Sequence, residues 1–323
     1  MTVTVWARPR RFPQLPPGQR RFFSVGDGTY VLADCNWQPR RDEAPVLLAL
    51  HGLEGSSESH YMKGLAEKAW LRGFSVIRLN QRNCGGTEHL TRGLYHSGLT
   101  DDARAVVEEI ITRDRVPAVT IAGYSLGGNV ALKLAGEYGA LAPPELVAVS
   151  AVSPPIDLPQ AIVLLERRLN LPYQWNFVSS LKRQIQRKRA VFPDSYSTDG
   201  LGRIRTVRAF DDRYTAPQSG FCDAVDYYER ASAIHVIPRI SVPTLILSAV
   251  DDPFIPAAPF RDPRVTGNPS VEVLLTSHGG HCGFLSRRCA DHDGYWAEWK
   301  IIEFMQQAMD GRGEAEVEER KVG

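Results

Sequence analysis

The sequence of 323 residues predicts an α/β protein with a mostly parallel central sheet, helices on both faces and an inserted helical lid. Short apolar runs alternate with amphipathic stretches, which is the pattern of successive strand–helix units. Several of these runs are almost continuously apolar, as is typical of strands covered on both faces. The alternation stops near residue 153 and returns near residue 241, so a long segment interrupts the sheet-forming part of the chain.

The first half of the chain begins with residues 1–19, a Pro- and Arg-rich stretch that we expect to form an extended surface arm. Residues 21–25 and 29–33 then flank Gly26-Asp27-Gly28, and an Asp-Gly pair suits a tight hairpin turn. After this hairpin, strands alternate with helices. We expect strands at 45–50, 74–79, from 119 and at 146–152, and helices near 59–71, 100–113 and after residue 125.

The second half of the chain is less regular. Residues 153–240 show no strand–helix alternation, and we expect helical stretches near 160–168, 175–189 and 220–233. Strands are then expected at 244–250 and 271–275, followed by a helix near 295–309. The predicted organisation is an arm (1–19), a core formed by residues 20–152 and 241–309, a lid (153–240) and a charged, frayed tail (310–323).

Composition narrows the classes of function. The net charge of +1 gives no reason to expect a nucleic-acid partner. The sequence contains no apolar stretch long enough to span a bilayer, and the basic N-terminus lacks the apolar segment of a signal peptide. Five cysteines without a Cys-x-x-Cys pair fit a reducing compartment. We therefore expect a cytoplasmic protein.

A strand-to-helix turn at Gly123-x-Ser125-x-Gly127 organises the predicted site. This pattern is typical of a nucleophile elbow, in which small neighbours leave room for a serine on a strained turn. The turn lifts the Ser125 hydroxyl above the sheet edge and places it at a helix N-terminus, where developing negative charge is favoured. We therefore predict that Ser125 is a nucleophile.

A serine nucleophile needs a base and an orienting carboxylate, expected here in the chain order Ser, Asp or Glu, His. Asp251 and Asp252 both follow a predicted strand, and we favour Asp252 because Asp-Pro-x-x-Pro is the usual layout of this loop in serine hydrolases. His278 and His281 both follow the next strand. We favour His281, since two flexible glycines precede it and it lies further from the strand end.

The tetrahedral oxyanion of acyl transfer needs hydrogen-bond donors. The backbone N–H groups of Leu53, in the Gly-rich loop after residue 50, and of Leu126, directly after the nucleophile, are the candidates. A zinc site built from the histidines and cysteines at 278–292 is not expected, because their spacing fits no standard ligand pattern. Neither a metal nor another cofactor is predicted.

Taken together, the motifs resemble the α/β-hydrolase superfamily and, within it, the YheT-like group (α/β-hydrolase family four), over roughly residues 45–285. The matching segments are His51-Gly52-Leu53-Glu54-Gly55-Ser56, Tyr95-His96-Ser97-Gly98 with Asp101-Asp102, the elbow 123–129, Phe210-Asp211-Asp212, Gly220-Phe221, Asp226-Tyr227-Tyr228, Ser232, Asp251-Asp252-Pro253-Phe254 and the His278–Phe284 loop. The resemblance implies a serine carboxylester hydrolase or acyltransferase, with Ser125, Asp252 and His281 at the triad positions of the family.

The predicted function is therefore hydrolysis of small carboxylic esters, with short- to medium-chain or lipid-like acyl groups, through an acyl-enzyme on Ser125. Two alternatives stay open at this point. One is an alcohol O-acyltransferase that uses the same triad, and the other is an idle hydrolase fold that serves as a binding module.

Overall fold

The computed structural model describes residues 10–26, 28–289 and 292–322. Residues 1–9 of the expected arm and Asp27 of the expected hairpin turn lie outside the described residues, as do 290–291 and 323.

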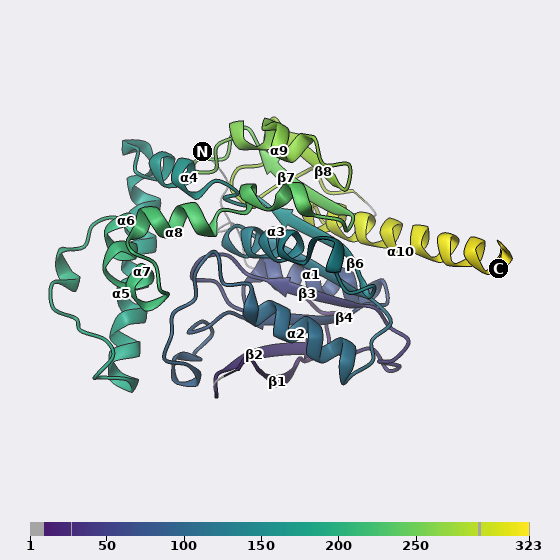
Figure 1. The fold of residues 1–323 in the computed structure, drawn as a ribbon, viewed down its shortest axis with the longest axis horizontal. Helices are drawn as coiled ribbons and strands as arrows, with labels where there is room; N and C mark the ends of the chain where they lie inside the picture. The colour runs from purple at the N-terminus through teal and green to yellow at the C-terminus, as the bar shows by residue number, and fades with distance from the viewer. Residues whose placement is uncertain (1–9, 27, 290–291, 323) are drawn as a thin grey trace.

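One sheet of eight strands, in the order β1-β2-β4-β3-β5-β6-β7-β8, runs through the described part of the chain (Figure 1). β1 (Gln19–Ser24) and β2 (Tyr30–Asn36) form the expected hairpin, and β2 also pairs antiparallel with β4 (Ser75–Asn80). All other neighbours are parallel: β3 (Val46–Leu50), β4, β5 (Val119–Tyr124), β6 (Leu146–Val152), β7 (Thr244–Ala249) and β8 (Val271–Thr276). The predicted fold class, α/β with a mostly parallel sheet, is confirmed.

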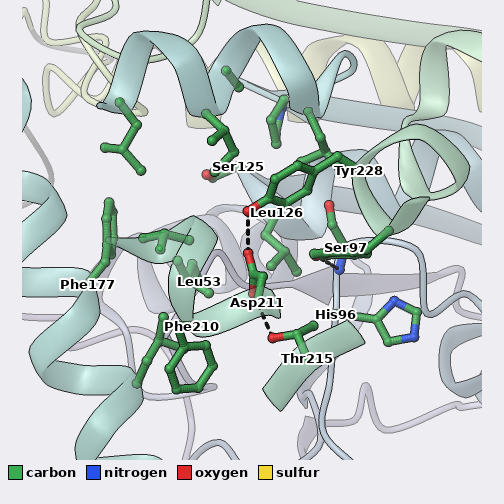
Figure 2. Close-up of a pocket in the computed structure, with 18 of the residues that line it drawn as sticks. Leu53, His96, Ser97, Ser125, Leu126, Phe177, Phe210, Asp211, Thr215 and Tyr228 are labelled. Atoms are coloured by element: carbon green, nitrogen blue, oxygen red, sulfur yellow. Dashed lines mark hydrogen bonds between the residues drawn. The ribbon is translucent and has the colours of Figure 1, made fainter. Parts of the chain in front are cut away.

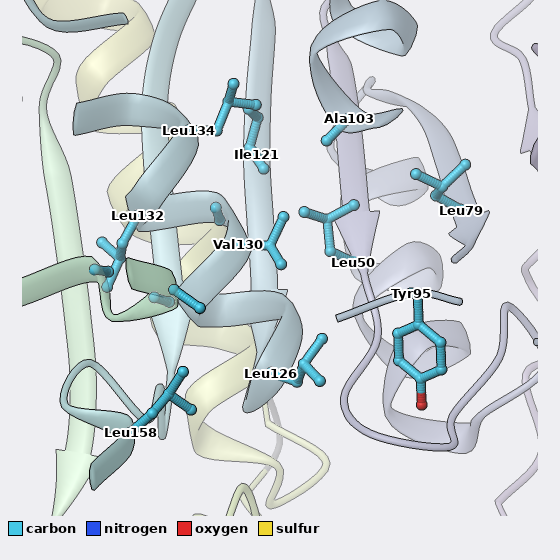
Figure 3. Packing of buried hydrophobic residues seen from close by; sticks show 14 of the residues in the cluster. Leu50, Leu79, Tyr95, Ala103, Ile121, Leu126, Val130, Leu132, Leu134 and Leu158 are labelled. Atoms are coloured by element: carbon cyan, nitrogen blue, oxygen red, sulfur yellow. The ribbon is translucent and has the colours of Figure 1, made fainter. Parts of the chain in front are cut away.

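The central strands β3, β5, β6 and β7 are buried at every position, because helices cover both faces of the sheet. α1 (His60–Leu71) and α10 (Trp296–Val322) pack on one face, and α2 (Asp101–Thr112) and α3 (Leu126–Tyr138) pack on the other. On the second face, Val130 and Leu134 of α3 lie against Ile121 of β5 (Figure 3). The sheet therefore has no solvent-facing side in its centre.

A helical segment, defined here as residues 153–243, connects β6 to β7 and lies at one end of the sheet, on the left in Figure 1. Its helices are α4 (Leu158–Leu165), α5 (Leu171–Val191), α6 (Val207–Phe210), α7 (Ala216–Gln218) and α8 (Ala224–Ala231), with a π-helical turn, η5 (Asp211–Thr215), between α6 and α7. Its buried side chains belong to the same apolar cluster as those of β3, β5 and α3. It shares one core with the sheet.

Short turns complete the chain. They are the 3₁₀ turns η1 (Glu88–Leu90), η2 (Gly139–Leu141), η3 (Arg168–Asn170), η4 (Leu201–Arg203), η6 (Ala233–His235), η7 (Ile237–Arg239) and η8 (Ala258–Arg261), and the one-turn helix α9 (Pro263–Thr266).

Several helix boundaries differ from the expectation, and those of α8 and α10 have a local explanation. The helix expected at 220–233 begins only at Ala224, because Asp223 caps it by accepting a hydrogen bond from the backbone N–H of Asp226 (2.8 Å). α10 continues to Val322, where we expected a frayed tail from residue 310. The charged residues of this stretch are mostly Glu, Lys and Arg, which are good helix formers.

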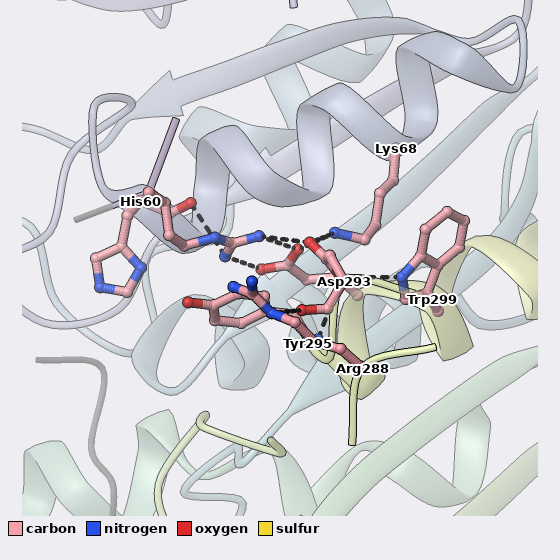
Figure 4. Close-up of polar contacts among 8 residues, drawn as sticks. His60, Lys68, Arg288, Asp293, Tyr295 and Trp299 are labelled. Atoms are coloured by element: carbon pink, nitrogen blue, oxygen red, sulfur yellow. Dashed lines mark hydrogen bonds and ion pairs between the residues drawn. The ribbon is translucent and has the colours of Figure 1, made fainter. Parts of the chain in front are cut away.

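A buried ionic network ties the N-terminal residues to the face of the sheet that α1 and α10 cover (Figure 4). Glu298 of α10 accepts hydrogen bonds from Arg10 and from Lys68 of α1, each at 2.7 Å. Lys68 also lies 2.7 Å from Asp293, and the Arg10 guanidinium stacks 3.4 Å from the centre of the Tyr295 ring. Each buried cation thus has a carboxylate partner, as burial of a charge requires.

Within the described residues, no helix combines the length and the apolar composition that crossing a membrane requires.

Candidate active site

Ser125 lies on a strained turn between β5 and α3. Its backbone has φ 51° and ψ −119°, a conformation that non-glycine residues rarely adopt. The flanking glycines are required by space, since a Cβ at Gly123 would lie 2.1 Å from the carbonyl oxygen of Gly127, and a Cβ at Gly127 would lie 2.5 Å from the carbonyl oxygen of His51. The turn therefore has the geometry that the Gly-x-Ser-x-Gly pattern predicts.

The structure brings Ser125, His281 and Asp252 together in one hydrogen-bonded row. Nε2 of His281 lies 2.9 Å from Oγ of Ser125, and its Nδ1 lies 2.9 Å from Oδ2 of Asp252. The second oxygen of Asp252, Oδ1, accepts hydrogen bonds from the backbone N–H groups of Phe254 and Ile255. The Asp252 side chain is fully buried, so its carboxylate is held in one orientation by three donors.

The alternative candidates Asp251 and His278 lie outside this row. Oδ1 of Asp251 accepts hydrogen bonds from the backbone N–H groups of Gly279 and Gly280, each at 2.8 Å, and so fixes the loop that carries His281. The side chain of His278 is 89% exposed and lies 3.5 Å from Asp251, outside the row. Asp251 therefore supports the loop, His278 is exposed, and His281 lies between Asp252 and Ser125.

The pKa of His281 lies above the ordinary value for histidine. Burial alone would lower it, but the neighbouring Cys282 and the Asp252 carboxylate raise it by more, so the net shift is upward. An imidazole in this environment is a stronger base than a free histidine, which suits the removal of a proton from a serine hydroxyl.

The loop after β3 is held by tyrosine hydroxyls. The backbone N–H of Gly52 donates to Oη of Tyr61 (3.0 Å), and the backbone N–H of Glu54 donates to Oη of Tyr95 (2.8 Å). Among the hydrogen bonds of the described residues, none occupies the backbone N–H of Leu53 between them or that of Leu126 at the start of α3. These two groups, predicted as oxyanion donors, are thus free to bind a ligand oxygen.

His51 fixes the start of the same loop. Its Nε2 accepts a hydrogen bond from the backbone N–H of Gln81 (3.1 Å), and its Nδ1 lies 2.8 Å from the carbonyl oxygen of Gly52. Complete burial lowers the pKa of His51 to about 4, so its ring is neutral at pH 7 and supports the backbone.

Ser125 forms part of the wall of two pockets. The first, which we call the apolar pocket, lies between α3 and the helical segment (Figure 2). Its apolar wall consists mainly of Leu53, Leu126, Leu158, Ile162, Phe177, Val207, Phe210 and Phe254. The second, which we call the His281 pocket, is more polar and is lined by Gly52, Gly55, Tyr61, Asn176, Arg183, His281 and Cys282 among others.

Sequence reasoning missed several residues that shape this site. Asn170 of η3 donates to the carbonyl oxygen of Pro253 (2.6 Å) and so ties the helical segment to the loop of Asp252. Gln184 of α5 donates to Oε1 of Glu54 (3.1 Å), beside the predicted oxyanion loop. No local pattern marks these side chains, since each acts across more than 80 residues of sequence.

The fold and this row of side chains define a protein of the α/β-hydrolase type, and comparison with known proteins agrees. A family model described as alpha/beta hydrolase fold matches residues 45–287. The chain is 34% identical over 308 residues to YheT of Escherichia coli (strain K12), an esterase by name, and the match covers 94% of this chain and 88% of that protein. It is 29% identical over 313 residues to the mouse protein named phospholipase ABHD3, with coverage of 92% and 74%.

Among solved structures, the Pyrococcus furiosus esterase Pf2001 shares the fold, with a TM-score of 0.59 at 15% identity over 90% of this chain and 92% of that chain. The chain belongs to the α/β-hydrolase-fold family, and its similarity to YheT confirms the YheT-like resemblance. The prediction of a carboxylesterase-like hydrolase is confirmed at the level of this family.

Proposed function

We propose that the protein hydrolyses carboxylic esters through an acyl-enzyme intermediate on Ser125. The observation that carries the proposal is the row of Oγ of Ser125, the imidazole of His281 and the carboxylate of Asp252, with 2.9 Å at each step. The esterase and phospholipase names of the relatives support an ester as the substrate.

In this mechanism, His281 takes the proton of Ser125 as the hydroxyl attacks the ester carbonyl, and returns it to the leaving alcohol. Asp252 holds the imidazole in the tautomer that leaves Nε2 free to accept that proton. The backbone N–H groups of Leu53 and Leu126 bind the oxyanion. A water molecule then repeats the attack on the acyl-enzyme, with His281 again acting as the base.

The two pockets take different halves of the substrate. The leaving oxygen must lie within reach of Nε2 of His281, so the alcohol part occupies the pocket that His281 lines. The acyl chain then extends into the apolar pocket. The predicted lid, residues 153–240, makes up most of the helical segment and closes this pocket. A pocket with mostly apolar walls suits a short- to medium-chain or lipid-like acyl group.

The test combines labelling and turnover. The purified protein is treated with a fluorophosphonate probe, and hydrolysis of p-nitrophenyl butyrate and longer esters is measured for the wild type and for Ser125→Ala. We expect labelling of the wild type alone and a loss of about four orders of magnitude or more in kcat for the variant, as is usual when a triad nucleophile is removed. Undiminished turnover by Ser125→Ala contradicts the proposal.

Adding an alcohol to the same assay separates hydrolysis from acyl transfer. Release of acid that exceeds ester synthesis at every alcohol concentration supports a hydrolase. Synthesis that exceeds hydrolysis identifies an alcohol O-acyltransferase, and a native protein that is never labelled is an idle fold with a binding role.

A further inference from the structure

One carboxylate stands in the wall of the apolar pocket. Asp211 is buried and lines the same cavity as Ser125, together with its neighbours Thr215 and Tyr228 (Figure 2). The hydroxyl of Tyr228 donates to Oδ2 of Asp211 (2.7 Å), and the hydroxyl of Thr215 donates to Oδ1 (2.6 Å). The mechanism above uses none of these three groups.

The backbone at this place is unusual. Asp211 begins the π-helical turn η5, which separates α6 from α7. A π-helical turn is less stable than a regular α-helix and occurs frequently at functional sites. Asp211, at the start of this turn, lines the cavity with its carboxylate.

The hydrogen bonds of Asp211 leave room for a ligand. A carboxylate has about four acceptor positions, and the two hydroxyls fill two of them. No salt bridge to Asp211 occurs among the described residues, since the nearby cation Arg208 is paired with Glu166 at 3.0 Å. A buried carboxylate without a cation is costly unless further donors reach it. The cavity is where such a donor can enter.

We propose that Asp211 determines specificity on the acyl side by binding a hydroxyl group carried by the acyl chain of the substrate. Tyr228 and Thr215 hold the carboxylate in place, and the apolar walls contact the methylene groups between the ester carbonyl and that hydroxyl. The preferred substrates are accordingly esters of hydroxy acids. This inference rests on the proposed function, because it needs the acyl chain to lie in the apolar pocket.

The test uses pairs of p-nitrophenyl esters with acyl chains of six to twelve carbons. One member of each pair ends in a hydroxyl and the other ends in a methyl group. A hydrogen bond to a charged acceptor is strong enough to change kcat/KM roughly tenfold or more. We therefore expect the wild type to prefer the hydroxyl member by about tenfold or more at one or more chain lengths.

Two variants assign that preference to Asp211. Asp211→Asn keeps the size of the side chain but removes its charge, and should reduce the preference by roughly tenfold. Asp211→Leu should reverse it in favour of the methyl member. The matched control is Asp212→Asn, the same change at the adjacent, exposed residue, whose side chain accepts a hydrogen bond from the backbone N–H of Ala224. At about pH 8, where Asp211 is ionised with or without the charge of Asp212, this variant should leave the preference unchanged.

The pH dependence of the preference is a second readout. Burial raises the pKa of Asp211 to about 6, while Thr215, Tyr228 and Arg208 oppose this rise and Asp212 adds to it. The preference should therefore increase as the pH rises through about 6 in the wild type and stay flat in Asp211→Asn. His96 lines the same pocket but has a pKa lowered to about 4, so its titration falls at lower pH.

The outcomes separate this inference from the function on which it rests. Hydrolysis of both members of every pair at equal rates contradicts the role of Asp211 and leaves the esterase intact. A preference that is unchanged in Asp211→Asn and Asp211→Leu also contradicts that role. If neither member of any pair is hydrolysed, the inference is wrong, and the proposed function is wrong as well when p-nitrophenyl butyrate is also left intact.

Discussion

The sheet edge and the helical segment build the candidate site in different ways. At the sheet edge, backbone groups hold the reacting side chains: two N–H groups fix Asp252, two more fix Asp251, and a strained turn presents Ser125. The helical segment contributes side chains such as Phe177 and Asp211 to the pocket wall. It is tied to the edge by long-range hydrogen bonds from Asn170 and Gln184.

This difference suggests a division of labour. Backbone donors are independent of side-chain identity, so the geometry at the sheet edge is fixed by the fold. Side chains on the helical segment change with single substitutions while the sheet stays intact. Substitutions at the edge should therefore change the rate of the chemical step, and substitutions in the segment should change which ester is used.

The largest effect is expected at the paired aspartates of the sheet edge. Asp252→Asn should lower kcat by roughly four orders of magnitude, because the imidazole loses the partner that selects its tautomer. Asp251→Asn should lower it by about tenfold or less, because an amide oxygen still accepts from the N–H groups of Gly279 and Gly280. Steady-state kinetics of both variants, with circular dichroism as the fold control, make the test. Equal losses would mean that the two carboxylates share one role.

The pH profile of kcat/KM with a methyl-ended ester reports the sheet edge alone. His281 must be neutral to accept the proton of Ser125, and its pKa is raised. The acid limb of the profile should therefore have its midpoint above pH 6.5, the ordinary value for histidine, with activity falling about tenfold per pH unit below it. In Asp252→Asn the midpoint of the residual activity should move down. A wild-type midpoint below 6.5 would show that burial outweighs the effects of Cys282 and Asp252.

A smaller effect is expected where the two regions meet. Asn170→Ala removes hydrogen bonds to the carbonyl oxygens of Leu164 and Pro253, and should lower kcat/KM by about tenfold as the loop of Asp252 loses this support. Asn268→Ala is the control away from the site, because it removes two similar bonds, to the carbonyl oxygens of Ile237 and Ile240, and one that Asn268 accepts from the backbone N–H of Ser270. Both variants should lose roughly 1–3 kcal/mol of unfolding free energy in urea. Equal activity in the two variants would show that the contact with Pro253 is only structural.

The difference between the sheet edge and the helical segment also explains which parts of the site could be predicted from the sequence. The strands, and the loops that carry Ser125, Asp252 and His281, follow from apolar runs and from residues that come directly after them. Gly123 and Gly127 can also be recognised in the sequence, because the strained turn leaves no room for a Cβ at either position. Local physics is enough for this part of the molecule.

The rest depends on contacts between distant residues. Tyr227 and Tyr228 enter the sequence analysis only as part of a matching segment. In the structure, the hydroxyl of Tyr228 donates to Asp211, and that of Tyr227 accepts a hydrogen bond from the backbone N–H of Ser97 (2.9 Å). The π-helical turn at Asp211 has no local signal either. The role of a side chain in the helical segment depends on how the segment packs on the sheet. The apolar periodicities of helices (3.6 residues) and strands (two residues) carry no information about this packing.

The backbone at Ser125 has a final consequence for evolution of the chain. Because the left-handed conformation at this position disfavours any side chain, the residue that the proposed mechanism uses as nucleophile is also one at which glycine would relax the polypeptide. At position 125, stability thus favours glycine, whereas the proposed reaction requires serine. The proposed role of the hydroxyl accounts for a serine at this position, since glycine would strain the backbone less.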